Sequence, residues 1–350
     1  MDGITSMAST ESDFFCIDHL SEHPGMIHSI VFAARAFYDL SVGIPFSNTA
    51  QFHLSKSLQH LQLSLNDKTE VTKDTTISIV ILLATAAILS GEFATAEKHR
   101  DGLYSLINLR GGVDSIPPGS LIEHKIQTID LGLAIGVGSE PCFIRKNISW
   151  SPHLARGSRT SRFPEFDMLR RRPDPRLLNV WADLRELSDA ADRASGTGAK
   201  IPGHDFSRLN TSVPYRLVRL DCDPTSLDEV LRACMLGYMK ILTVKIHGIG
   251  RKMVFLAARM KTALLAQEAP PFVEHARVLF WALIITRLSV FEDFDHEWLQ
   301  TLLMETASVL GLNTWDEARA ILKEYLWIDT VLDKPASQVF KEWCIPNTCP

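Results

Sequence analysis

The acidic cluster FEDFDHE at residues 291–297 is the group of side chains in this chain best suited to bind a metal ion. Helical enzymes of isoprenoid chemistry place aspartate-rich motifs on buried helices, where the carboxylates hold Mg²⁺. Here the acids stand at positions 292, 293, 295 and 297, which is not the DDxxD spacing, and a second metal motif is missing. Carboxylates also stabilise the positive end of a helix dipole, so we interpret the cluster as the start of a helix. A Mg²⁺-dependent site at residues 292–297 is the alternative.

Twelve histidines and six cysteines could supply general bases, nucleophiles or zinc ligands. No HExxH or GxSxG motif occurs. The cysteines include no CxxC pair and fit neither a disulfide framework nor a zinc site, so they are interpreted as reduced thiols of an intracellular protein. Histidines 19, 23 and 28 lie close together in the sequence, which we interpret as chance. We therefore predict no catalytic residue, no metal site and no cofactor.

The composition indicates a folded protein with a large core. The 350 residues are 46% hydrophobic and carry a net charge of -5, which does not suggest nucleic-acid binding by the chain as a whole. The first residues include acidic side chains and no apolar segment, so no secretory signal or membrane anchor is predicted. We expect a disordered tail at residues 1–24 and one helical domain at residues 25–345.

The segment from Thr72 to Gly112 predicts two helices that fold back on each other. The first helix begins near Thr75, is apolar on all sides and ends at Gly91, so it should be buried. The second runs from about Ala94 to Arg110, and Gly111 and Gly112 end it. Gly102 lies on the edge of its apolar face, where we expect close approach of the alanines of the first helix. Five residues form one face of the second helix: His99, Leu103, Leu106, Ile107 and Arg110.

The rest of the chain predicts an all-α fold built from αα-hairpins, with no clear alternating strand. Long loops are expected near residues 142–176 and 195–225. The predicted helix that begins at residue 48 or 49 and reaches about residue 65 has an apolar stripe at positions 54, 58, 61 and 65. Asp130 lies within an apolar helix at residues 121–137 and therefore needs a partner. Further helices are expected at residues 26–40, 177–194, 226–248 with a continuation toward 265, 272–290, 298–310 and 315–325.

The loop at residues 145–176 is basic, with nine Lys and Arg against three acids. A solvated loop is the simplest interpretation of such a segment. The alternative is a nuclear-import or phosphate-contacting patch at Arg170, Arg171 and Arg172.

The hairpin resembles the H-x-x-G-L…RGG signature of the fungal-specific transcription factor domain, the regulatory region that follows binuclear zinc-cluster DNA-binding modules. The matching residues are His99, Gly102, Leu103, Arg110, Gly111 and Gly112, followed by Asp130 in the next helix. The similarity extends over residues 50–145, and more loosely over residues 225–345. The six-cysteine cluster of the DNA-binding module does not precede Met26, so direct DNA binding is not predicted.

The resemblance implies a non-enzymatic regulatory domain that influences transcription in the nucleus, with the cytoplasm as the alternative location. Its partner would be a small-molecule effector or a protein, such as a DNA-binding transcription factor. Arg110 is expected either to cap its helix or pair with Asp130, or else to line an effector pocket with His99. Two other hypotheses stay open: a helical Mg²⁺-dependent enzyme using residues 292–297, and a helical interaction scaffold suggested by the repeat-like turn GEFATAEKH.

Overall fold

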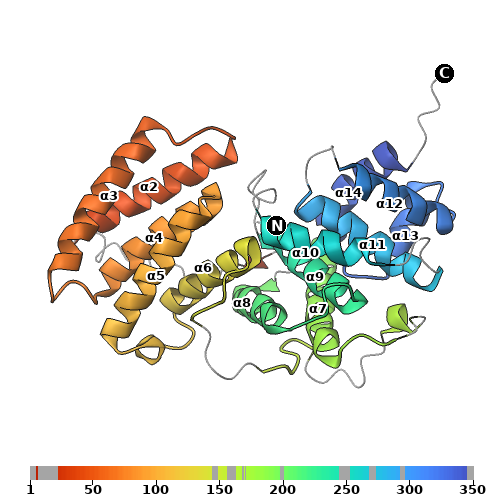
Figure 1. Ribbon diagram of the computed structural model, residues 1–350, viewed down its shortest axis with the longest axis horizontal. Helices are drawn as coiled ribbons and strands as arrows, with labels where there is room; N and C mark the ends of the chain where they lie inside the picture. Colours follow the sequence, from red (N-terminus) through yellow and green to blue (C-terminus); the bar gives the residue numbers. More distant parts are fainter. Residues whose placement is uncertain are drawn as a thin grey trace. The chain divides into compact units, whose positions relative to one another are not determined.

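The computed structural model describes residues 5–6, 23–143, 149–155, 163–167, 169, 171–197, 201–243, 253–267, 273–291 and 296–344. Within these ranges the fold is all-α, as predicted (Figure 1). The described strands are β1 (Thr5–Ser6) and β2 (Ile201–Pro202), which form a single short parallel pair. The contacts divide the helices into two compact units.

One unit contains five α-helices and a short 3-10 helix, and its core is formed around α4. Almost every side chain of α4 from Thr76 to Ala87 is buried. Four helices contact it, so the prediction of a buried helix is confirmed. A helix without a polar face can be stable in water only when other elements cover all its sides. The elements are α2 (Pro24–Ser41), α3 (Asn48–Asn66), α4 (Asp74–Ser90), α5 (Phe93–Arg110), η2 (Val113–Ser115) and α6 (Leu121–Val137).

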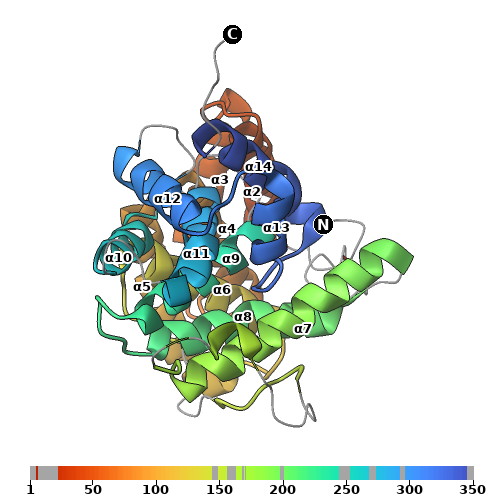
Figure 2. The same ribbon diagram turned by 90° about the vertical axis from the view of Figure 1, so that its right-hand side faces the viewer.

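The second unit contains β1, β2 and the helices from α7 onward, and α11 has the same role there. The residues of α11 from Ala276 to Ile285 are buried with the exception of Arg277. Contacts with α9, α10, α12, α13 and α14 enclose the helix (Figure 2). The elements are η3 (Pro164–Phe166), α7 (Pro175–Thr197), α8 (Gly203–Arg219), α9 (Leu227–Thr243), α10 (Val254–Leu265), α11 (Val273–Ser289), α12 (Glu297–Val309), α13 (Trp315–Leu322) and α14 (Asp329–Trp343).

The predicted loop at residues 195–225 is wrong over most of its length, because α8 occupies residues 203–219. Pro214 and the nearby glycines suggest that no helix forms here, yet Pro214 lies inside α8. The buried face of α8 includes Leu209, Val213 and Leu217, which follow helical spacing. Tertiary burial of this stripe therefore outweighs the cost of the proline.

The described part of the predicted loop at residues 142–176 is not simply a solvated segment. Phe163, Phe166 and Leu169 are buried. The ring of Phe166 packs edge-on against Trp181 of α7, which in turn packs against Trp281 of α11. Glu165 accepts hydrogen bonds from the Trp181 indole at 2.9 Å and from Arg185 at 2.8 Å. Aromatic packing and these bonds fix this segment to the core of its unit.

A buried ion pair joins α7 to α8. The Asp183 carboxylate accepts a hydrogen bond from the Arg216 guanidinium at 2.6 Å, and both side chains are fully buried. The other Asp183 oxygen accepts from the backbone N–H groups of His153 at 2.7 Å and Leu154 at 2.8 Å. Asp183 therefore connects two helices and an irregular segment of the unit.

Replacement of Asp183 by Ala should lower the free energy of unfolding by about 3–5 kcal/mol, because Arg216 would remain buried without its counter-charge. Urea denaturation of the full chain would measure the change. Asp189→Ala is a matched control, since Asp189 is exposed on the same helix and should change stability by less than about 0.5 kcal/mol. Equal stability of the two variants would contradict this role of the ion pair.

Candidate functional site

The predicted motif residues lie on the α4–α5 hairpin and on α6, which follows it. Gly91 ends α4 in the left-handed conformation, with φ of 74°, and α5 begins at Phe93. Gly111 and Gly112 also have positive φ, and the N–H of Gly112 donates to the Ile107 carbonyl at 2.8 Å. The predicted helix ends are thus confirmed, and the double glycine serves as a C-cap.

His99 and Leu103 lie on the inward side of α5, but Gly102 does not. Leu103 is completely buried, and His99 is half-buried, so desolvation lowers the pKa of its imidazole. A Cβ atom added at Gly102 would meet nothing within 4 Å. The predicted close approach of the α4 alanines to Gly102 is therefore wrong.

The close helix contacts occur instead at two glycines of α6. A Cβ atom at Gly136 would lie 2.6 Å from the Phe93 ring, and one at Gly132 would lie 3.1 Å from Ile88. These glycines allow α6 to pack against the end of α4 and the start of α5. Helical spacing places Gly102 beside the apolar stripe of its helix. It does not show whether a neighbouring helix covers that side of the stripe.

Arg110 forms an ion pair with Asp74, whereas the sequence suggests Asp130 as its partner in one of the three interpretations of Arg110. Arg110 belongs to the last turn of α5, and Asp74 to the first turn of α4. Each charge is favoured by the dipole of its own helix end, because cations stabilise C-termini and anions N-termini. The pair therefore joins the open ends of the hairpin.

Asp130 has the partners that its burial requires, and they are backbone amides. Its carboxylate accepts hydrogen bonds from the N–H groups of Cys142 at 3.0 Å and Phe143 at 2.9 Å. Burial raises the pKa of the Asp130 carboxyl, and the two amide bonds oppose this shift. The bonds hold the segment after α6 so that Phe143 is buried, with its ring 5.7 Å from that of Tyr104. Asp130 is thus the polar anchor of this region.

Sequence reasoning missed a group of four histidines between α2 and α3. Nδ1 of His28 lies 2.9 Å from Nδ1 of His53, and the His28 ring stacks on that of His60. His23 packs edge-on against His60, and its Nε2 lies 3.0 Å from the Ser64 hydroxyl. Helical spacing gives a signal for part of this group, since His53 and His60 are seven residues apart and share a face of α3.

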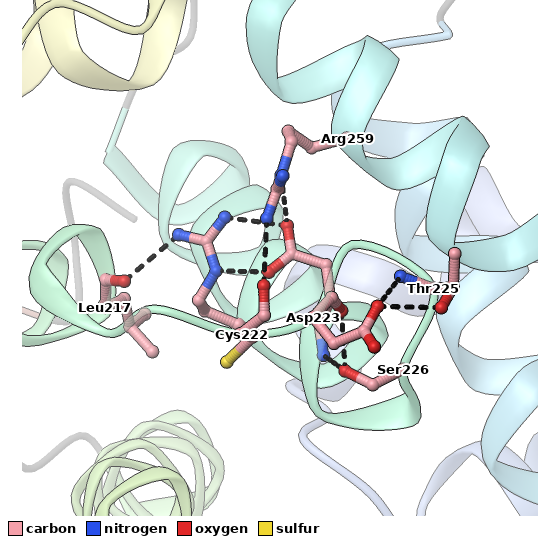
Figure 3. A network of polar contacts seen from close by, with 8 residues as sticks. Leu217, Cys222, Asp223, Thr225, Ser226 and Arg259 are labelled. Carbon is pink, nitrogen blue, oxygen red and sulfur yellow. Dashed lines mark hydrogen bonds and ion pairs between the residues drawn. The ribbon is translucent and has the colours of Figure 1, made fainter.

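A second network that the sequence did not reveal lies in the other unit (Figure 3). Glu229 of α9 is fully buried and accepts from Arg232 at 2.6 Å and from Arg259 of α10 at 2.7 Å. Arg232 also donates to the Leu217 carbonyl at 3.0 Å. Glu229 is a capping-box residue by sequence, and its N–H does donate to Ser226 at 3.2 Å, but its carboxylate binds the arginines. The network joins three helices and has no geometry suited to a reaction.

The remaining candidates give no site within the described residues. The acids at positions 292, 293 and 295 lie outside the described residues, as does Arg170. Arg171 and Arg172 are exposed. In the described ranges, no three His, Cys, Asp or Glu side chains come together in a way that could hold a metal ion. Among the described helices, none has the length and hydropathy that a membrane span requires.

Replacement of Asp130 by Ala should reduce the free energy of unfolding by about 2–4 kcal/mol, because two buried N–H groups lose their acceptor. Asp130→Asn keeps one acceptor oxygen and should lose about half as much. Asp101→Ala is the control, since the Asp101 side chain is largely exposed on α5. An Asp130→Ala protein as stable as the control in urea denaturation would contradict the anchoring role.

Acidification from pH 7.5 to 5.5 should destabilise the chain through His23 and His28. Desolvation is the main cause that lowers the pKa of both imidazoles in the folded protein. The stability that depends on uncharged His23 and His28 is therefore fully present above the unfolded pKa of about 6.5. It is lost as the pH falls through the pKa values of the folded protein.

The His23→Gln, His28→Gln double variant should lose less stability than the unmodified chain between these two pH values. Thermal denaturation at both pH values measures the difference. Asp130, whose raised pKa acts in the opposite direction, contributes equally to both proteins and cancels. An equal loss in both proteins would show that these histidines do not sense pH.

Comparison with protein families gives a match at the N-terminal part of the chain. The sequence model described as "Fungal specific transcription factor domain" matches residues 10–135. Within the described residues this region runs from the start of α2 almost to the end of α6, and it contains every residue of the predicted motif. No curated protein and no solved structure matched the chain. The resemblance seen in the sequence is therefore confirmed for residues 10–135, which match the model of the fungal specific transcription factor domain.

Proposed function

We propose that this chain regulates transcription and that it does so by binding a partner protein. The family match, which covers the helices of one compact unit, is the observation that supports this most directly. Domains of this family regulate gene expression, and no reaction is part of the proposal. The motif residues Leu103 and Asp130 are buried in the core of that unit, where they can maintain a binding surface without touching the partner.

A protein partner is better supported than a small-molecule effector. An effector pocket lined by His99 and Arg110 would need both side chains to be available to a ligand. Arg110 is instead engaged with Asp74, and His99 lies half-buried on α5. A DNA-binding transcription factor is the class of partner that the family match suggests, since such a protein would bring the domain to a promoter.

The nucleus is the proposed location, because a regulator of transcription acts there. Arg171 and Arg172 are exposed and follow a segment rich in basic residues. Short basic clusters of this kind serve as nuclear-import signals. A fluorescent fusion of the full chain would show the location directly.

The proposal is tested by tethering the full chain to a heterologous DNA-binding module upstream of a reporter gene. We expect the fusion to change reporter output several-fold relative to the module alone. The Asp130→Ala fusion should weaken the effect because its unit is destabilised, and the Asp101→Ala fusion should retain it.

Deletion of the gene in its own host provides an independent measurement, in which transcript levels should change and the unmodified gene should restore them. A folded fusion that leaves the reporter unchanged, together with unchanged transcripts after deletion, would overturn the proposal. Transcript changes with an inactive fusion would show that the partner is absent from the reporter host, which a pull-down from the native host then tests.

A further inference from the structure

Exposed apolar side chains are concentrated on the α2–α3 hairpin. Fifteen large hydrophobic side chains are exposed in the described part of the chain, and nine of them lie between residues 27 and 65. Concentrations of exposed apolar surface mark interaction sites, whereas isolated ones need no explanation. The nine are Ile27, Phe37, Tyr38, Val42, Ile44, Phe52, Leu58, Leu63 and Leu65.

Part of the apolar stripe on the helix at residues 48–65 is also exposed. Leu61 is buried as expected, but Leu58 and Leu65 are exposed at 44% and 40%. The stripe is therefore only partly buried, because α3 makes most of its contacts with α2 and few with α4. Apolar residues on α3 thus exceed what the core of its own unit can cover.

The outward side of α2 is apolar from Ile27 to Tyr38. Ile27, Val31, Ala34 and Tyr38 stand at i, i+4, i+7 and i+11, so they share one side of the helix. Phe32 and Ala36 on the opposite side are buried in the core. On α3, Phe52 is exposed at 54% and its ring lies edge-on to the His28 ring, which continues the surface from α2 to α3. We call this surface the α2–α3 face.

The α2–α3 face carries almost no charge. Residues 24–66 contain three charged side chains, Arg35, Asp39 and Lys56. Arg35 pairs with Asp39 at 2.9 Å and lies over the Tyr38 ring at 5.0 Å, so these two charges cancel. Desolvation and the neighbouring His53, His60 and Lys56 lower the pKa of His28, which favours its uncharged form. Lys56 is the third charge, and its ammonium group donates a hydrogen bond to the Gln59 side chain at 3.1 Å.

This chemistry defines what can cover the face. Charged side chains on a partner would be dehydrated at this face and would find no opposite charges there to pair with. The partner must therefore present an apolar, charge-poor helical surface. A second copy of the chain offers such a surface, and a two-fold axis places it against itself.

The size of the face is also suitable. Helices of 18 and 19 residues are about 27 Å long, and two of them side by side cover a projected area on the order of 500 Å². Accessible area exceeds projected area, so the face is comparable with the roughly 800 Å² per partner of a standard interface.

We propose that a second copy of this chain covers the α2–α3 face, so that α2 and α3 of both copies form a four-helix bundle. Tyr38 and Phe52 are the aromatic anchors of this interface. The dimer does not depend on the proposed role in transcription, and its test is separate from the reporter experiment.

The full chain at about 10–100 µM and pH 7.5 is examined by sedimentation velocity, together with Tyr38→Glu, Phe52→Glu and the control Leu109→Glu. We expect the unmodified chain to sediment with twice the chain mass of 39.1 kDa. Tyr38→Glu and Phe52→Glu should weaken the dimer at least tenfold, since each buries a charge in an apolar interface. Leu109 is exposed at 69% on α5, outside the face, so Leu109→Glu should leave the dimer unchanged.

Circular dichroism must show equal helicity in all four proteins, which is expected because the three substituted side chains are exposed. A monomeric unmodified chain at 100 µM would overturn the proposal, and so would a dimer that neither Tyr38→Glu nor Phe52→Glu weakens. A monomer that captures a different protein through this face would assign the surface to another partner and would likewise overturn the second-copy assignment.

Discussion

The fold of the matched region depends on enclosing one helix that has no polar face. The helix α4 is buried along most of its length, and α2, α3, α5 and α6 contact it. Its burial removes a large apolar area from water, which is the main stabilising contribution available to a unit of this size. The other unit repeats the same solution around α11. Each unit is therefore organised by one apolar helix and the amphipathic helices that cover it.

Buried carboxylates fix the segments that have no regular structure. Asp130 accepts the N–H groups of residues 142 and 143, and Asp183 those of residues 153 and 154. Glu229 instead joins two arginines from different helices. A buried carboxylate without partners would cost several kcal/mol, so each of these groups determines the path of the chain around it. Their role is to hold the chain in place, and their geometry offers no reactive centre.

Much of this architecture could be predicted from the sequence, because local signals determine it. The ends of α4 and α5 follow from glycines with positive φ, which the sequence places at the ends of the two predicted helices. Errors arose where tertiary packing decides the outcome. The sequence cannot tell that Gly102 faces open space while Gly136 meets Phe93, or that Arg110 pairs with Asp74, 36 residues away. The helix that contains Pro214 could not be predicted for the same reason. Its stability comes from burial of its apolar side chains against other helices of the unit.

We propose that the buried motif residues Leu103 and Asp130 maintain a packed core in the matched region, and that binding takes place on surfaces outside that core. Native-state hydrogen exchange of the full chain tests this most directly, because amides in the core of a unit exchange only when the whole unit unfolds. The amides of residues 79–87 should be the slowest to exchange in the matched region, and those of α3 faster by orders of magnitude. Exchange of α4 as fast as that of α3 would contradict the account.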